Sequence, residues 1–258
     1  MADRSLNAAL LFGGLLAIAA ACLLGSTAMG ADRVFAALVG MGDQTDRIIV
    51  WDIRLPRALA AFIVGLALGA SGAALQGLLR NPLAEPGVLG VSASASLGAT
   101  FAFYYGLTEW SAWALPIAAI VGALLATMLL ALAAIRTRSV VTLILIGVGL
   151  SSFAGALMSL LLNLAPNPFS LSDMFNWLLG SVANRSFDDI ALAAPFMLGG
   201  LAILMATRRG LSALTLGEEA ASGLGLDLAR QRLWVVLGAG LATGAAVAIA
   251  GAIGFVGI

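Results

Sequence analysis

The sequence contains no histidine and no lysine, so all 13 of its basic residues are arginines. Without lysine there is no G-x-x-x-x-G-K-[ST] phosphate-binding loop, and the chain cannot form a P-loop ATPase by itself. Without histidine there is no Ser-His-Asp triad and no imidazole ligand for zinc or haem iron. The single cysteine, Cys22, excludes an internal disulfide and a cysteine-cluster metal site. We therefore expect no catalytic residue, metal ligand or bound cofactor in this chain.

Charge of either sign is also scarce in this sequence. Only 10% of the 258 residues are charged, 61% are hydrophobic, and the mean hydropathy is +1.05. A soluble domain has roughly 25% charged residues, so these values indicate an integral membrane protein whose surface is mostly solvated by lipid. The formal net charge is zero and therefore points to no nucleic-acid or acidic partner.

Long apolar segments follow one another through the chain. A segment of about 20 apolar residues crosses the hydrocarbon core as a helix. The sequence therefore predicts an all-α, polytopic helical bundle that forms one transmembrane domain over residues 1–258. The complete spans predicted are 6–29, 57–79, 88–107, 112–135, 140–163, 189–207 and 231–251. Residues 251–258 begin another apolar segment and then stop, so we expect the chain to be incomplete at its C-terminus.

The arginines give the expected orientation of these spans. If the N-terminus is cytoplasmic, the inner segments carry Arg4, Arg80, Arg136, Arg138, Arg208, Arg209, Arg230 and Arg232. The outer segments carry Arg33, Arg47, Arg54, Arg57 and Arg185. Since cytoplasmic segments collect Arg and Lys, this distribution favours a cytoplasmic N-terminus. The outer segment 30–53 has no strong structural signal.

The connection at residues 80–87 is interrupted by proline. Asn81-Pro82 and Pro86 break the helix twice, because proline lacks an N–H donor and restricts the residue before it. We expect these residues to form a structural turn on the inner side.

Two short helices are expected between spans. One runs from Ser170 to Gly180 on the outer side, with Ser172 as its N-terminal cap. The other runs from Thr215 to Leu224 on the inner side, where Thr215 and Glu218 fit a capping box and Gly225 fits the stop. From the residues alone, the inner helix is equally well interpreted as a partner contact or as ordinary loop structure.

The predicted span 140–163 carries small and polar residues at every fourth position. These residues are Gly147, Ser151, Gly155, Ser159 and Asn163. Their spacing places them on one slowly winding stripe of the helix. Small residues at this spacing allow close helix packing, whereas Ser and Asn also suit a polar pathway. Both interpretations stay open at this point.

Several short motifs occur together in a fixed order. They are Arg54-Leu-Pro-Arg57, Gly72…Gln76, Arg80-Asn-Pro-Leu-Ala-Glu-Pro-Gly87 with Leu89-Gly90, Leu216-Gly-Glu-Glu219 with Leu224-Gly225, and Gly251-Ala-Ile-Gly-Phe-Val-Gly257. From about Arg54 to Ile258 the chain resembles the FecCD family, the permease subunits of bacterial ABC importers for iron-siderophores, haem and cobalamin. Family members normally continue beyond the last motif with a Pro-His…Arg stretch and further helices.

This resemblance implies a type II ABC importer permease with ten helices in the complete subunit. It implies a homodimer in the bacterial inner membrane, with the translocation pathway between the two subunits. It also implies two further partners, a periplasmic substrate-binding protein and ATP-binding cassette subunits that carry ATP and Mg. The chain itself would then be a transport subunit and not an enzyme.

The resemblance also implies roles for particular residues. Arg54 and Arg57 match the outer arginines that meet glutamates of the binding protein, although arginines at such a position can also anchor a helix to lipid headgroups. The stripe residues match a pathway-lining helix, and Ser139 and Thr142 lie where the family places a cytoplasmic gate. The residues that match the ATPase-coupling region are Leu216, Gly217, Glu218, Glu219, Leu224 and Gly225.

These implications favour ATP-driven import of an iron-siderophore chelate, and import of cobalamin or haem by the same machinery is the alternative. An ion-coupled secondary transporter needs acidic groups near the membrane midplane, and the central thirds of the predicted spans hold none. An intramembrane enzyme needs a catalytic base, and Ser92, Ser94, Ser96 and Gln76 have none beside them.

Overall fold

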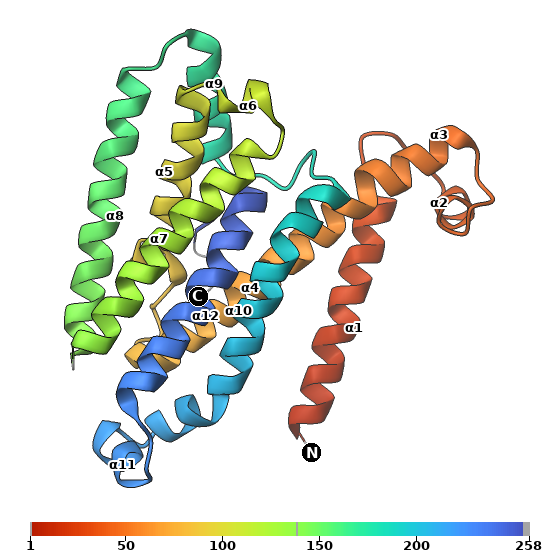
Figure 1. The fold of residues 1–258 in the computed structure, drawn as a ribbon. Helices are drawn as coiled ribbons and strands as arrows, with labels where there is room; N and C mark the ends of the chain where they lie inside the picture. Colours follow the sequence, from red (N-terminus) through yellow and green to blue (C-terminus); the bar gives the residue numbers. More distant parts are fainter. Residues whose placement is uncertain (1, 138, 255–258) are drawn as a thin grey trace. The chain divides into compact units, whose positions relative to one another are not determined.

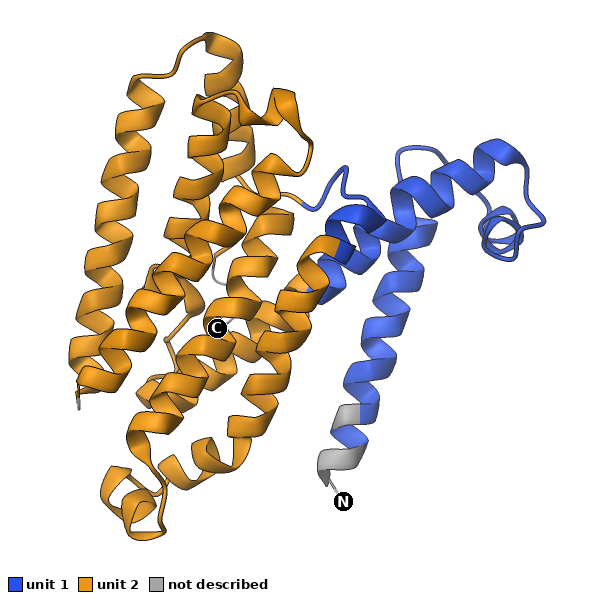
Figure 2. Cartoon of the chain, in the orientation of Figure 1, with its two compact units in different colours: residues 1–63, 182–191 blue, residues 64–181, 192–258 orange. Residues whose placement is uncertain are grey.

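A computed structural model describes residues 2–137 and 139–254 of the chain, and every regular element in them is helical (Figure 1). The chain divides into two compact units (Figure 2). Unit 1 comprises residues 1–63 and 182–191, and unit 2 comprises residues 64–181 and 192–258. The helices α4 (Leu55–Leu79) and α10 (Phe187–Leu214) each contribute to both units.

Unit 1 contains α1 (Ala2–Leu23), α2 (Ala31–Leu38), α3 (Gln44–Arg47) and a π-helix, η1 (Ile48–Arg54), which leads directly into α4. Its small apolar core consists of Cys22, Val34, Ala37, Val50 and Ala58.

The segment 30–53, which has no strong structural signal in the sequence, is therefore largely helical. The reason is a contact between residues distant in sequence. Arg33 donates to the buried carboxylate of Asp46, with Nε–Oδ2 at 2.9 Å and Nη2–Oδ1 at 2.5 Å. An ion pair across 13 residues leaves no local periodicity that a sequence pattern could reveal.

Unit 2 contains three complete long helices, α7 (Ala114–Arg136), α8 (Val140–Asn163) and α12 (Leu228–Ala250). Shorter elements connect or flank them. These are the 3₁₀ helix η2 (Pro86–Leu89), α5 (Val91–Tyr104), α6 (Leu107–Trp110), α9 (Pro168–Leu178) and α11 (Glu218–Gly223). In Figure 1, α6 and α9 lie at one end of unit 2 and α11 lies at the opposite end.

Among the described residues, five helical stretches are long and apolar enough to cross a membrane. They are 44–79, 114–136, 140–163, 187–214 and 228–250, which correspond to five of the predicted spans. Within α1, the apolar stretch Ala8–Leu23 is shorter than these. The prediction of a complete span over 88–107 is wrong, because α5 has only 14 residues. Gly90 and Gly106, with φ of 76° and 64°, interrupt the helix at both ends.

The α9 helix begins earlier than the sequence suggested. Its N-cap is Asn167, whose side chain accepts a hydrogen bond from the Ser170 amide at 2.8 Å. Pro168 occupies the first helical position, where a missing N–H has no consequence. The predicted cap, Ser172, lies inside the helix instead.

The α11 helix is also capped differently at its start. Its N-cap is Gly217, and the Thr215 hydroxyl donates to the Ser212 carbonyl at 2.7 Å, so the predicted capping box does not form. The predicted stop is confirmed, because Gly225 has φ of 88°. The Gly225 and Leu226 amides donate back into the last turn, to Ser222 and Ala221, in a Schellman motif.

The core of unit 2 depends on close approach of helix backbones. A Cβ placed on Gly122 of α7 would lie 2.2 Å from the Ser94 carbonyl oxygen of α5. In the same way, a Cβ placed on Gly98 of α5 would lie 2.2 Å from the Ala118 carbonyl oxygen of α7. On the other side, a Cβ on Gly240 of α12 would lie 2.2 Å from the Thr127 hydroxyl. Glycine at these positions is what allows the three helices to pack together.

We expect Gly122→Ala to lower the free energy of unfolding by about 1–3 kcal/mol, because the added methyl group meets backbone that cannot move aside. Gly149→Ala on α8 is the matched control, since nothing lies within 4 Å of the Cβ it would add. Thermal unfolding in detergent measures both. Equal melting temperatures for the two variants would contradict this packing.

Candidate docking, pathway and coupling sites

The guanidinium of Arg54 is buried inside unit 1, where its side chain closes the C-terminus of α1. Its Nη1 donates to the carbonyls of Cys22 and Leu23 at 2.8 and 3.0 Å, and its Nη2 donates to that of Thr27. Only 2% of Arg54 is exposed. The last carbonyls of a helix have no intrahelical partner and carry the negative end of the dipole, so a buried cation satisfies them.

Gly25 fits the same arrangement. A Cβ at this position would lie 2.9–3.0 Å from the guanidinium atoms of Arg54. The chain after α1 therefore wraps closely around the Arg54 head group. A guanidinium held in this way has no surface to offer a carboxylate of another protein, which differs from the outward presentation expected of Arg54.

Arg57 is placed differently, one helical turn further along α4. It is half-buried, and its Nη2 makes one contact at 3.3 Å to the Leu24 carbonyl, at an exposed position. Arg57 therefore keeps donors on the surface of unit 1. Of the two arginines predicted to dock a partner, the geometry supports Arg57.

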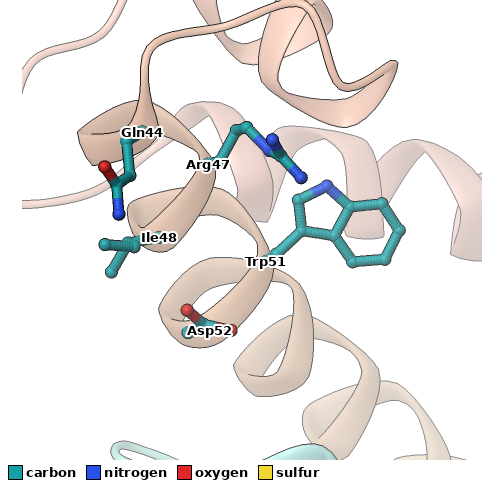
Figure 3. A pocket seen from close by; sticks show the side chains of 5 residues that line it. All are labelled: Gln44, Arg47, Ile48, Trp51 and Asp52. Carbon is teal, nitrogen blue, oxygen red and sulfur yellow. The ribbon is translucent and has the colours of Figure 1, made fainter.

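An open hollow lies beside the π-helix of unit 1. It is lined by Gln44, Arg47, Ile48, Trp51 and Asp52 (Figure 3). The Arg47 guanidinium and the Trp51 indole lie next to each other in this view. The indole Nε1 donates to the Ala37 carbonyl at 3.2 Å, while 42% of Trp51 stays exposed. The sequence did not single out this hollow, because a π-helix has no distinct sequence pattern.

The predicted stripe on α8 has two different environments. At its first half, a Cβ on Gly147 would lie 2.8 Å from the Cα of Leu89, and the Ser151 hydroxyl approaches the Gly87 carbonyl at 3.5 Å. Gly90 completes this contact, since a Cβ there would lie 2.8 Å from the Gly147 carbonyl oxygen. This half of the stripe packs against η2.

The second half of the stripe is not covered in the same way. Nothing lies within 4 Å of a Cβ placed on Gly155, and Ser159 and Asn163 are exposed. The Asn163 amide only donates back to the Ser159 carbonyl at 2.8 Å. The structure therefore separates the two interpretations along the helix, with packing at the first half and a free polar surface at the second.

The residues predicted to couple to an ATPase lie in and around α11. Leu216 and Leu224 flank this short helix and are 67% and 71% exposed. Glu219 is exposed as well. Gly217, with φ of 102°, and Gly225 bound the helix on either side. Two exposed leucines beside an exposed carboxylate form a small surface suited to contact with another protein.

Glu218 differs from its exposed neighbour. Nη2 of Arg232 on α12 donates to both of its carboxylate oxygens at 3.0 Å. Nη2 of Arg80, in the turn after α4, lies 3.8 Å from Oε1. The sequence indicated Arg232 only as a topology signal. A charged residue at the start of an apolar span was the one clue to this ion pair.

The predicted turn and gate residues lie at helix ends of unit 2. The Asn81 side chain accepts from the Leu83 amide at 2.9 Å, Pro82 follows it, and Pro86 is buried at the first position of η2. The Ser139 hydroxyl caps α8 by accepting from the Thr142 amide at 3.3 Å, and both residues are exposed.

Two of the predictions fall on residues outside the described part of the chain. Arg138, one of the inner arginines, is the first, and residues 255–257 of the last motif are the second. Gly251 to Gly254 are described and are not helical.

Taken together, these features define a class of protein: a polytopic, all-α membrane protein with a short, exposed helix between two of its spans. The chain belongs to the FecCD transport family, whose model matches residues 10–258.

Individual relatives agree with this assignment. The chain is 41% identical over 230 residues to the ABC transporter permease protein YvrB of Bacillus subtilis (strain 168), covering 87% of this chain and 64% of that protein. It is 39% identical over 211 residues to the vitamin B12 import system permease protein BtuC of Salmonella typhi, covering 82% of this chain and 64% of that protein. The chain thus spans 64% of the length of these relatives.

A solved structure has the same fold. It is a metal-chelate type ABC transporter in an inward-facing conformation, with a TM-score of 0.83 and 30% sequence identity. The likeness covers 96% of this chain and 78% of that one. The predicted membership of the FecCD family is therefore confirmed.

We expect Arg54→Met to lower the free energy of unfolding by at least about 2 kcal/mol, because charge-assisted hydrogen bonds to the end of α1 are lost at a buried position. Arg57→Met removes the same charge from a half-buried residue with one long contact, and we expect a much smaller loss. Thermal unfolding of the two variants tests this. If Arg57→Met were the more damaging change, the assignment of Arg54 as a helix clamp would be wrong.

Proposed function

We propose that this chain is the permease subunit of an ATP-driven importer in the bacterial inner membrane, with its N-terminus in the cytoplasm. A periplasmic binding protein delivers an iron-siderophore-type chelate, and separate subunits bind ATP and Mg and hydrolyse the nucleotide. The main support is the likeness, over 96% of the chain, to a metal-chelate type ABC transporter. The chain itself carries out no covalent chemistry in this scheme.

A second cargo has a specific observation in its favour. The BtuC relatives, at 39% identity, belong to vitamin B12 import systems. A corrin is a large metal chelate, as is a ferric siderophore, so both fit the same kind of pathway. The small residues of α8 do not favour one over the other.

The proposed outer contact uses Arg57. A planar guanidinium offers parallel N–H donors that match a carboxylate, and such charge-assisted pairs are stronger than neutral hydrogen bonds. Arg54 stabilises this arrangement indirectly. It fixes the chain at the end of α1, and Arg57 donates to the Leu24 carbonyl in the same segment. In a homodimer each copy would supply one such arginine.

The proposed pathway uses the uncovered half of the α8 stripe. Gly155, Ser159 and Asn163 would face the second copy across the pathway, while Gly147 and Ser151 hold α8 to η2. In the proposed orientation, Ser139 and Thr142 lie at the cytoplasmic end of the same helix, beside the expected gate. The exposed surface of α11 would meet the ATPase subunit. The movement needed for alternating access would then pass through helices held by small-residue contacts.

Reconstitution of the full-length permease with its ATPase subunit and binding protein tests the proposal directly. We expect ATP-dependent uptake of a radiolabelled ferric siderophore into liposomes, and less or no uptake of labelled cobalamin. Uptake of cobalamin alone would replace the cargo and leave the machinery in place. No ATP-dependent uptake of any chelate would overturn the proposal.

In the same preparation, we expect Arg57→Glu to weaken binding of the periplasmic protein by at least about tenfold, since it replaces an attractive charge pair by a repulsive one. Binding is measured by surface plasmon resonance on the permease complex in nanodiscs. Arg209→Glu is the control, because Arg209 is also exposed and lies on the cytoplasmic side in the proposed orientation. Equal affinities for the two variants would reject the docking role.

Cysteine labelling distinguishes the two halves of the stripe. We expect Ser159→Cys to react with an aqueous maleimide in at least one nucleotide state and Ser151→Cys to stay protected, because Ser151 packs against η2. Leu160→Cys is the control on a different face of α8 and should react only with a lipid-soluble reagent. Protection of Ser159→Cys in every state would leave no evidence for a pathway on this face.

A further inference from the structure

Two adjacent glutamates of α11 have different surroundings, and this difference suggests different functions. Glu218 is the first residue of α11 and is only partly exposed, with its carboxylate turned to Arg232. Glu219 is exposed. Successive residues of a helix point about 100° apart, so the two carboxylates point in different directions.

Arg232 fixes Glu218 to the start of α12. Its side chain is only 5% exposed, and its Nη2 lies 3.0 Å from both carboxylate oxygens of Glu218. Loss of the carboxylate would leave a buried charge without its partner, which is strongly destabilising. Any displacement of Glu218 therefore requires either that this buried pair breaks or that the first turn of α12 moves with α11.

The same region of α12 is held to a third helix. The Gln231 amide donates to the Thr207 carbonyl of α10 at 3.0 Å, in a buried position. A Cβ on Gly210 would lie 2.2 Å from the Gln231 side chain, so glycine leaves the space that this amide occupies. The first turn of α12 is thus joined to α11 by Arg232 and to α10 by Gln231.

A second, longer ion pair connects Glu218 to Arg80 in the turn after α4. Arg80 follows the last residue of α4, has a left-handed backbone with φ of 49°, and places Nη2 at 3.8 Å from Glu218. One carboxylate therefore joins α11, the first turn of α12 and the turn after α4. These three elements belong to the same compact unit.

We propose that Glu218 is a positioning residue that transmits movement of α11 to α12 and α4 through Arg232 and Arg80, whereas Glu219 contacts the ATPase subunit. This inference rests on the proposed function, since it assigns separate roles within the coupling surface. Movement imposed on the exposed side of α11 reaches the spans through an ion pair and does not need the backbone connections at Gly217 and Gly225.

The test uses the full-length permease in complex with its ATPase subunit and binding protein. In Glu218→Gln we expect the ATPase subunit to stay bound, while the ratio of binding-protein-stimulated to basal ATP hydrolysis falls about tenfold. In Glu219→Gln we expect the ATPase subunit to dissociate more readily during purification. Glu109→Gln, an exposed carboxylate on α6 at the other end of unit 2, should match the wild type in both measurements.

A double-mutant cycle tests the ion pair itself. Arg232→Gln should lower the ratio as Glu218→Gln does, and the double variant should lose little more, because both single changes remove the same interaction. Fully additive losses would show that the two residues act separately and would overturn the linkage. If Glu218→Gln does not fold, Arg80→Gln removes only the longer ion pair and should lower the ratio by a smaller factor, and an unchanged ratio would count against the proposal.

Hydrogen exchange of the permease alone gives a readout that does not depend on transport. Glu218→Gln should speed amide exchange in α11 and the first turn of α12, and leave α5 unchanged. The proposal would be overturned if Glu218→Gln showed both wild-type amide exchange and a wild-type ratio of stimulated to basal ATP hydrolysis. It would also be overturned if Glu218→Gln lost the ATPase subunit to the same degree as Glu219→Gln. If the wild-type complex shows no stimulation, the proposed function fails, and the exchange comparison still decides whether Glu218 holds α11.

Discussion

Direct contact between helix backbones is the interaction on which the structure of unit 2 depends. In a bilayer the surrounding lipid is as apolar as the helices, so burial of apolar surface drives helix association only weakly and close van der Waals packing takes its place. Gly98 and Gly122 bring α5 against α7, and Gly240 and Gly244 bring α12 against α7. The consequence is a central helix, α12, with 78% of its apolar window buried, and a peripheral helix, α8, with only 17% buried. That difference leaves a free polar surface on the second half of α8, at Gly155, Ser159 and Asn163.

Buried arginines provide the second constraint, and they act at helix ends. Arg54 satisfies the last carbonyls of α1, and Arg232 holds the first residue of α11. Both residues are less than 5% exposed, yet both guanidinium groups are hydrogen-bonded within the chain. Packing contacts fix the middles of the spans in this protein, and charges fix two of the helix ends.

Much of the architecture could be predicted from the sequence, because hydropathy and helix length report directly on membrane spans. The span 140–163 coincides with α8, and the other long spans agree with their helices within a few residues, with two exceptions. The α10 helix extends seven residues further than the predicted 189–207, and α1 ends at Leu23, six residues before the end of the predicted 6–29. The span over 88–107 failed because hydropathy alone does not register glycines with positive φ at either end of α5. The predicted N-caps Ser172 and Thr215 were also wrong, because Asn167 and Gly217 occupy the cap positions of α9 and α11 instead.

The sequence by itself determined the class of protein, the number and order of most helices, and the family, since these depend on composition, apolar length and short ordered motifs. Only the tertiary structure decided which of two similar residues is the more buried and which is the more exposed. Arg54 and Arg57 look alike in the sequence, as do Glu218 and Glu219, yet one of each pair is held inside the chain and the other reaches the surface. The physical reason is that burial and pairing come from residues distant in the chain, such as Cys22 and Arg232, whose positions no local pattern encodes.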